Sequence, residues 1–277
     1  MLPLPNILKN PDKVPYITFE KSDRESDFLC AFSTRLGGVS TGIYTSMNLN
    51  FRQGDDPENV LDNFRRIADS MGLDVSDMVY SDQTHTSNVR RMTADDRGKG
   101  IIKEKDYSDV DGMITDEPGL VLTGSFADCV PVFFMDPVHR AVGLSHSGWK
   151  GTAGRIGQGT VRAMAREFGT DPKDLKCIIG PSICVDCYEV SADVADVFME
   201  KFSGEEAEDI LYDKRNGKYQ LDLWKANRYV LTDAGVLPGN ITVSGLCTSC
   251  RSDLLWSHRK TKGKRGGLCG FISITRR

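Results

Sequence analysis

The chain has 277 residues and a mass of 30.7 kDa, with 39% hydrophobic and 27% charged residues, which is ordinary for a globular protein. A net charge of -4 and a pI near 5.7 argue against a nucleic-acid-binding protein, because such proteins neutralise phosphates with a basic surface. No apolar run approaches the length of a membrane span. The N-terminus, MLPLPNILKN, lacks the basic and apolar segments of a secretory signal, so we expect a cytoplasmic protein.

Apolar periodicity and turn residues predict alternating helices and strands. The first helix covers 55–73, with Asp56 as a candidate N-cap, Pro57 in the first turn and Gly72 at the end. The remaining predicted elements are, in chain order, strands 119–126, 130–136 and 140–146, helix 159–169, strand 176–180, helices 191–202 and 222–235, and strands 240–247 and 270–274. We predict one α+β domain over residues 1–277, with residues 1–28 as a peripheral segment.

One thiol and two imidazoles lie at the ends of predicted strands. Cys129 follows the strand 119–126, His146 ends the strand 140–146, and His85 lies in the polar stretch SDQTHTSNV. Two histidines and one cysteine are the ligand count of a catalytic zinc site that keeps one position for water or substrate. A metal-free alternative stays open, in which Cys129 and His146 form a thiolate–imidazolium pair for acyl transfer.

Seven blocks of the sequence closely resemble the laccase-domain family. They are FSTRLGGVSTGIYTSMNLN (32–50), QTHTSNV (83–89), DGMIT (111–115), ADCVPVFFMD (127–136), HSGWKGT (146–152), IGPSICVDCYEV (179–190) and WSHR (256–259). This family was once labelled multicopper polyphenol oxidase and is described as purine nucleoside phosphorylases with adenosine deaminase activity. The resemblance implies mixed β-sheet layers flanked by helices, a fold of the cysteine-hydrolase type.

The resemblance also implies a cofactor and its ligands. His85, Cys129 and His146 match the zinc ligands of the family. The chain has four histidines, far fewer than a multicopper oxidase needs, so the older label fits poorly. Copper(II) binds soft and borderline ligands more tightly than zinc on the Irving–Williams order, and is an alternative occupant of the same site.

Candidate residues for substrate and phosphate follow from the chemistry of phosphorolysis, which needs a bound phosphate beside the anomeric carbon. Arg35 in TRLGG is the first candidate for phosphate, and Lys150 with the start of the helix 159–169 offers a second anion site. Asn48 is a candidate contact of the ribose or phosphate. Asp128 is a candidate proton shuttle, with a turn residue that bonds its own backbone as the alternative.

Four further cysteines form two C-x-x-C pairs, CVDC (184–187) and CTSC (247–250). Such pairs often hold a structural zinc, but the gap between them is far wider than in a zinc ribbon. The resemblance implies no second metal centre at these positions, so reduced thiols in turns are favoured and a second zinc is the alternative. The basic run SHRKTKGKRGG (257–267) is either a solvated loop or an anion site. Many family members carry Thr-Gly-Arg near the C-terminus, whereas this chain reads TKGKRGG, which leaves the role of Arg265 open.

Three functions are weighed. The resemblance implies a zinc-dependent purine nucleoside phosphorylase acting on adenosine, inosine and S-methyl-5'-thioadenosine, with adenosine deaminase activity and with nucleoside and phosphate as its ligands. One alternative is a hydrolase that edits peptidoglycan precursors with the same cysteine, histidine or metal. The other is a non-enzymatic metal-binding partner protein.

Overall fold

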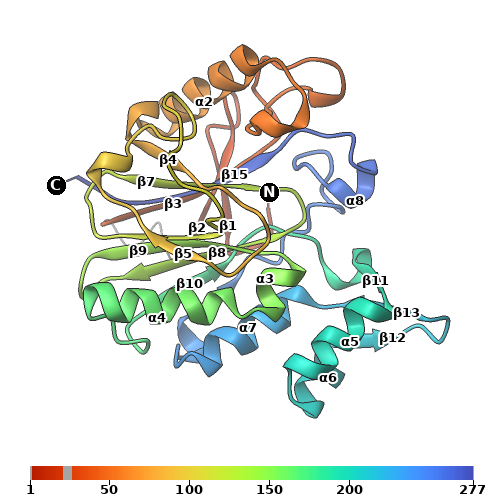
Figure 1. Cartoon of the computed structure of the whole chain (residues 1–277). Helices are drawn as coiled ribbons and strands as arrows, with labels where there is room; N and C mark the ends of the chain where they lie inside the picture. The colour runs from red at the N-terminus through yellow and green to blue at the C-terminus, as the bar shows by residue number, and fades with distance from the viewer. Residues whose placement is uncertain (1, 21–26, 277) are drawn as a thin grey trace.

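Two six-stranded sheets pack face to face in the computed structural model, which describes residues 2–20 and 27–276 (Figure 1). The first sheet has the order β1 (Asn6–Lys9), β2 (Tyr16–Phe19), β3 (Phe28–Ser33), β15 (Leu268–Ile274), β7 (Val121–Phe126) and β4 (Met78–Tyr80). The second has the order β14 (Ile241–Val243), β10 (Lys176–Ile179), β8 (Val130–Asp136), β9 (Ala141–Ser147), β6 (Gly112–Thr115) and β5 (Val89–Arg91). Most neighbouring strands are antiparallel, and β4–β7, β5–β6 and β10–β14 are parallel.

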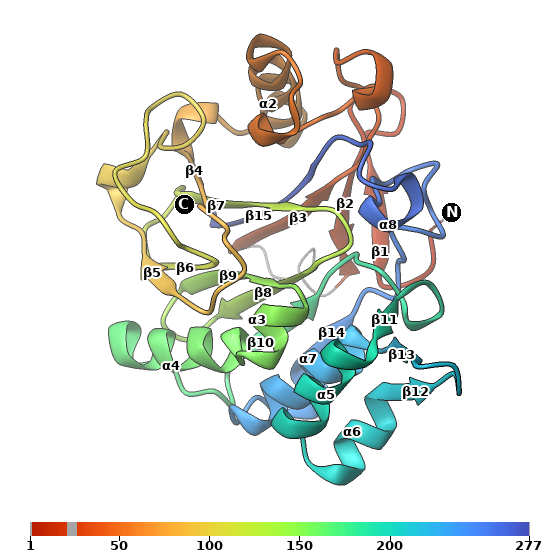
Figure 2. The same ribbon diagram turned by 45° about the vertical axis from the view of Figure 1, so that its right-hand side comes forward.

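Helices cover the outer faces of both sheets. Helix α2 (Pro57–Met71) lies over the first sheet, while α3 (Trp149–Ala153), α4 (Ile156–Phe168) and α7 (Leu223–Asp233) lie under the second (Figure 1). Figure 2 shows a smaller lobe of α5 (Ala192–Lys201), α6 (Gly204–Ile210) and the three strands β11 (Glu189–Ser191), β13 (Lys218–Leu221) and β12 (Leu211–Asp213). Helix α8 (His258–Thr261) precedes β15. Within the described residues, no helix combines the length and the apolar character needed to cross a membrane.

Strand β8 is apolar from Val130 to Met135 because the sheet is covered on both faces. Phe133 and Met135 enter the core between the two sheets, whereas Val130, Val132 and Phe134 enter the core between the second sheet and its helices. Successive side chains of a strand point to opposite faces, so a strand that is covered on both faces buries all of them. A third core joins α2 to the first sheet. The layers are therefore helix, sheet, sheet and helix, and the prediction of a single α+β domain is confirmed.

The structure confirms the predicted elements and changes some of their limits. Asp56 caps α2 by accepting a hydrogen bond from the backbone N–H of Glu58 at 3.0 Å, and Gly72 ends the helix with a left-handed φ of 69°. Strand β14 ends at Val243, before the predicted limit of 247. Helix α4 begins at Ile156 rather than 159, because the side chain of Ile156 is buried in the core.

The prediction that residues 1–28 form a peripheral segment is wrong for β2. Ile17 and Phe19 are fully buried in the core between the sheets, and β2 pairs with both β1 and β3. The alternation of YITF is too short to show this burial by itself, because four residues do not distinguish an edge strand from an irregular segment. The described N-terminal residues thus complete the first sheet.

Candidate metal centre and its pocket

The three candidate ligands converge where the chain crosses between the two sheets. Cys129 lies in the turn that joins β7 of the first sheet to β8 of the second, and His85 lies in the loop that leads from β4 to β5. The antiparallel register of β8 and β9 places His146 opposite Pro131, two positions after Cys129. One ligand atom from each of the three residues lies within 4.8 Å of the others. The convergence suits the coordination of a single ion.

The turn before Cys129 depends on Asp128. Asp128 has a left-handed φ of 84°, a conformation that aspartate tolerates better than most residues. One of its carboxylate oxygens accepts a hydrogen bond from Thr248 Oγ1 at 2.6 Å, and the other accepts one from the backbone N–H of Arg259 at 2.7 Å. The Asp128 carbonyl also accepts from the N–H of Ile183 at 3.0 Å. These bonds fix the turn that presents the Cys129 thiol.

A buried carboxylate, Asp111, organises both histidines. It accepts hydrogen bonds from His146 Nδ1 at 2.7 Å and from the backbone N–H groups of Thr84, His85 and Thr86 at 2.9, 3.1 and 3.0 Å. Because Nδ1 keeps its proton for Asp111, the proton that His146 loses on metal binding comes from Nε2, whose lone pair then faces the ion. Burial by itself raises the pKa of Asp111, but the hydrogen bonds from His146 and the loop have a larger opposite effect and lower the pKa to about 2. Asp111 is therefore ionised at neutral pH.

Cys129 and His146 each stabilise the charged form of the other. Burial raises the pKa of Cys129, but the positive charge and hydrogen bond of His146, together with His85, lower it to about 6. Burial lowers the pKa of His146, and the Cys129 thiolate and Asp111 outweigh this effect and raise it to about 9. The sulfur is thus a thiolate at neutral pH, which is the form that binds metals.

Gly148 makes room for the cysteine sulfur. A Cβ atom at this position would lie 2.9 Å from Cys129 Sγ and 3.6 Å from His85 Cδ2. The short turn HSGW that links β9 to α3 therefore passes directly beside the candidate ligands. A side chain at position 148 would displace the thiol.

A pocket of about 230 Å³ opens beside the three ligands. Phe126 and Ala127 form part of its apolar wall, and Arg265 and Arg52 bring positive charge to it. Burial lowers the pKa of Arg265, while the charges of Asp128, Cys129 and Tyr80 act in the opposite direction. The polar remainder of the lining comes from Asn50, Gln53, Tyr80, Ser81, Gln83 and Ser125. A cationic wall next to a metal centre favours a small anionic ligand.

The structure places the other predicted site residues away from this pocket. Arg35 stacks on Trp256 with its guanidinium carbon 3.7 Å from the ring centre, and it donates to the carbonyls of Ser252 and Thr45. Asn48 is fully buried and bonds Asp55 and the N–H of Gly267.

Lys150, of the second predicted anion site, is exposed on the short helix α3. The other part of that site, the start of the predicted helix 159–169, lies inside α4, which already begins at Ile156. Asp128, the predicted proton shuttle, lies beside the candidate centre because it directly precedes Cys129. Its carboxylate accepts hydrogen bonds from Thr248 and from the backbone N–H of Arg259.

Several site residues escape sequence reasoning. Asp111 begins the string DGMIT, but nothing in that string distinguishes a carboxylate that orients two histidines from a turn residue. Arg52 and Gln83 reach the pocket from loops, and Gln83 is anchored by two hydrogen bonds to the backbone of Ser125. The basic run 257–267 indicates a candidate anion site that includes Arg265, but only the fold shows that Arg265 and Cys129 line the same pocket.

His85, Cys129 and His146 form a candidate metal centre beside a pocket that Arg265 and Arg52 line. The chain belongs to the family described as multi-copper polyphenol oxidoreductase laccase, whose model matches residues 29–275. It is 37% identical over 259 residues to purine nucleoside phosphorylase YlmD of Bacillus subtilis (strain 168), covering 92% of this chain and 91% of that protein.

Two further comparisons agree with this family membership. The chain is 36% identical over 234 residues to adenosine deaminase RL5 of an unknown prokaryotic organism, covering 83% of this chain and 88% of that protein. The crystal structure of YlmD from Geobacillus stearothermophilus superposes with a TM-score of 0.90 at 34% identity, covering 98% of this chain and 100% of that one. The predicted family and the predicted fold class are confirmed.

We predict that Asp111→Asn weakens metal binding. The amide keeps the size of the carboxylate but removes the charge that orients His146 and the loop of His85, and loss of such an orienting partner typically costs about 10–100-fold in affinity. Zinc affinity measured by competition with a chelator tests this. Asp116→Asn is the control, because Asp116 pairs with Arg91 on the surface. Unchanged affinity in Asp111→Asn would contradict the role of Asp111.

We predict two regimes in the pH dependence of metal binding. Between pH of about 6 and about 9, Cys129 is a thiolate and His146 an imidazolium, so binding displaces the His146 proton. Below about 6 the Cys129 proton must also leave. The logarithm of the zinc affinity should therefore rise by about one per pH unit in the upper range and more steeply below it. In Asp111→Asn the upper end of this pH range should fall, because the His146 pKa that sets it loses the effect of the carboxylate. A constant slope through pH 6 would refute the thiolate assignment.

Proposed function

We propose that this protein is a zinc-dependent purine nucleoside phosphorylase that acts on adenosine, inosine and S-methyl-5'-thioadenosine. The observation that carries the proposal is the position of Arg265 in the same pocket as His85, Cys129 and His146. Phosphorolysis needs an anion held beside a group that activates the substrate. The names of relatives such as YlmD of Bacillus subtilis support this choice.

The donor set fits zinc. One thiolate and two imidazoles provide three ligands and leave one coordination position, which is the arrangement of catalytic zinc sites. His146 offers Nε2 because Asp111 holds Nδ1, and the Cys129 sulfur carries its charge at neutral pH. A bound zinc ion supplies Lewis-acid polarisation and lowers the pKa of water. The same donors would accept copper(II), so the metal present in a preparation depends on its supply.

The residues of the chain supply binding and charge stabilisation. The guanidinium groups of Arg265 and Arg52 hold the phosphate by charge-assisted hydrogen bonds. Phe126 and Ala127 offer an apolar wall to the base, and Gln83 is held rigid by its bonds to Ser125. Phosphate fixed next to the anomeric carbon converts a bimolecular attack into an intramolecular one and stabilises the positive charge that develops on the sugar.

Adenosine deamination is a second candidate activity of the same pocket. The likeness to adenosine deaminase RL5 favours it, and the chemistry needs water and a proton carrier instead of phosphate. Asp128 remains our candidate for proton transfer, although its carboxylate accepts bonds from Thr248 and Arg259. Deamination makes no use of a bound phosphate, so the two activities respond differently to Arg265.

The remaining alternatives receive less support. In the metal-free pair of Cys129 and His146, His85 would only help to lower the pKa of the thiol, whereas a metal centre uses it as the third ligand. A purely structural clamp gives no reason for two arginines in the adjoining pocket. A peptidoglycan-editing hydrolase would use the same centre, and the named activities of the relatives favour nucleosides over it.

The test is to incubate zinc-loaded protein with adenosine, with and without phosphate, and to separate the products by chromatography. Adenine and ribose 1-phosphate that form only with phosphate are expected, and inosine without phosphate would report deamination. Cys129→Ala should lose the bound zinc of this centre and both activities, because two remaining ligands hold the ion poorly. Cys177→Ala, which removes a buried thiol elsewhere, is the control. Full turnover in Cys129→Ala would refute the proposal.

We predict that Arg265→Ala separates the two activities. Removing a charged hydrogen-bond donor costs about 1.5–3 kcal/mol, so the KM for phosphate should rise by about 10–100-fold while deamination changes little. Steady-state kinetics at varied phosphate measures this. Lys264→Ala removes an exposed charge of the same loop and is the matched control. Equal effects of Arg265→Ala on both activities would contradict a phosphate contact.

A further inference from the structure

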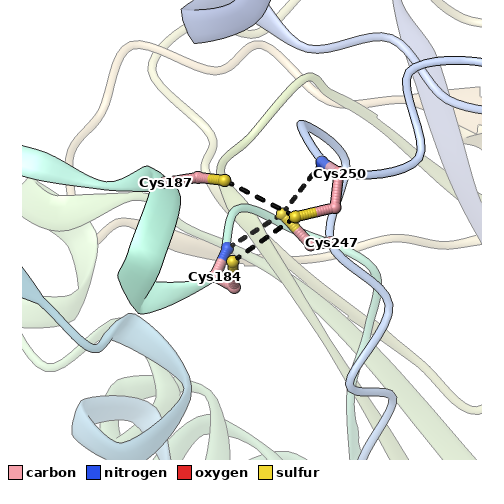
Figure 3. Close-up of side chains that lie close together, drawn as sticks. All are labelled: Cys184, Cys187, Cys247 and Cys250. Carbon is pink, nitrogen blue, oxygen red and sulfur yellow. Dashed lines mark hydrogen bonds between the residues drawn. The ribbon is translucent and has the colours of Figure 1, made fainter.

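Four cysteine sulfurs from two distant loops meet at a second point. Cys184 and Cys187 flank a single helical turn after β10, and Cys247 and Cys250 lie in the loop after β14 (Figure 3). An isolated parallel bridge between Ser182 and Cys247 joins the two loops. The four ligand atoms all lie within 4.8 Å of one another. The sequence favours separate reduced thiols in turns, whereas the fold gathers them.

The spacing of the sulfurs matches one tetrahedral ion. A zinc–sulfur bond of about 2.3 Å in a regular tetrahedron places neighbouring sulfurs about 3.8 Å apart. The Sγ atom of Cys250 lies 3.6 Å from that of Cys187 and 4.0 Å from that of Cys184. These separations are far longer than a disulfide bond of about 2.05 Å, and all four thiols are free. An iron–sulfur cluster needs room for several irons and sulfides between its thiolates, which this spacing does not provide.

Backbone N–H groups are aimed at the innermost sulfur. Cys247 is buried, and its Sγ accepts from the N–H of Cys184 at 3.3 Å and from the N–H of Cys250 at 3.4 Å (Figure 3). The bond from Cys184 crosses between the two loops. These backbone bonds hold the innermost sulfur in place and keep the two loops together around the cluster.

We propose that Cys184, Cys187, Cys247 and Cys250 bind a structural zinc ion, distinct from the ion of the His85, Cys129 and His146 centre. Four cysteines close the coordination sphere, so this ion has no position for substrate. Its energetic role is to join the loop after β10 to the loop after β14, which no long element holds together at this point. The proposal does not depend on which reaction the other centre performs.

The proposed ion also secures the turn of the first centre. Thr248 lies between Cys247 and Cys250 and donates to the carboxylate of Asp128 at 2.6 Å. Ile183, next to Cys184, donates its N–H to the carbonyl of Asp128 at 3.0 Å. Both loops therefore donate hydrogen bonds to Asp128, the residue that precedes Cys129. Thr248 is a positioning residue, and the cysteine cluster holds it in place.

The first test is to count zinc in the full chain by elemental analysis after zinc loading and desalting. Two ions per chain are expected in the wild type and in Cys177→Ala. Cys250→Ser and Cys187→Ser should each retain one, as should Cys129→Ala, and the double variant Cys129→Ala/Cys250→Ser should retain none. One zinc in the wild type, iron in place of the second zinc, or two zinc ions in Cys250→Ser would overturn the proposal.

Cobalt substitution tests the site without disturbing the cluster, in case a cysteine variant fails to fold. Cys129→Ala loaded with cobalt should keep intense thiolate-to-metal absorption, because all four sulfurs of the second site remain. Loss of that absorption in Cys129→Ala would overturn the assignment, since it would place the only thiolate-bound ion at the first centre.

A separate variant tests the connection between the two sites. Thr248→Val removes the hydrogen bond to Asp128 and leaves all four sulfurs, so two zinc ions should remain while the affinity of the first centre falls about tenfold. Thr261→Val, which removes a hydroxyl that bonds the carbonyl of Ser257, is the matched control. Unchanged affinity in Thr248→Val would refute the positioning role.

Discussion

The buried carboxylate of Asp111 is the interaction on which the site depends. It lies at the start of β6 in the second sheet, and it binds the loop that arrives from β4 in the first sheet together with His146 of β9. A buried ionised group is stable only when its oxygens are fully satisfied, and donors from the loop and from His146 satisfy this one. The same bonds that keep Asp111 charged therefore hold two histidines at a common point.

Around this anchor, crossings of the chain between the two sheets contribute parts of the site. The crossing from β4 to β5 brings His85 and the crossing from β7 to β8 brings Cys129, because the strands before them belong to one sheet and the strands after them to the other. The C-terminal segment closes the pocket before it returns as β15. Its Arg259 and Thr248 hold Asp128, and its Arg265 faces the pocket. Of the candidate metal ligands, only His146 lies on a strand, and the segments between strands carry His85, Cys129 and the pocket residue Arg265.

The sequence predicts the candidate metal ligands, but it does not predict the residues around them. Cys129 and His146 are predictable because Cys129 lies between two apolar strands and His146 ends the next one, and antiparallel pairing brings the start of one strand beside the end of its neighbour. Asp111 is not, because an aspartate before a strand looks the same whether it caps a turn or orients a histidine. Arg35 is misleading for the opposite reason: its flanking glycines suggest a phosphate loop, yet its guanidinium is engaged by Trp256 and two carbonyls.

The cysteine pairs show a different limit of sequence reasoning. Cys184 and Cys247 are 63 residues apart, and spacing alone cannot show that parallel pairing of β10 and β14 brings the loops after them together. The fold supplies that information, since parallel neighbours end at the same edge of a sheet. The short strand YITF near the N-terminus is a third case, where burial comes from a sheet built by residues far along the chain.

The most direct measurement of the central claim is anomalous diffraction at the zinc edge from crystals of the zinc-loaded protein grown with phosphate. The account predicts a peak bonded to Cys129 Sγ, His146 Nε2 and the imidazole of His85, with phosphate in contact with Arg265. Anomalous density that is missing from this point, or phosphate bound away from Arg265 while zinc occupies the site, would contradict it.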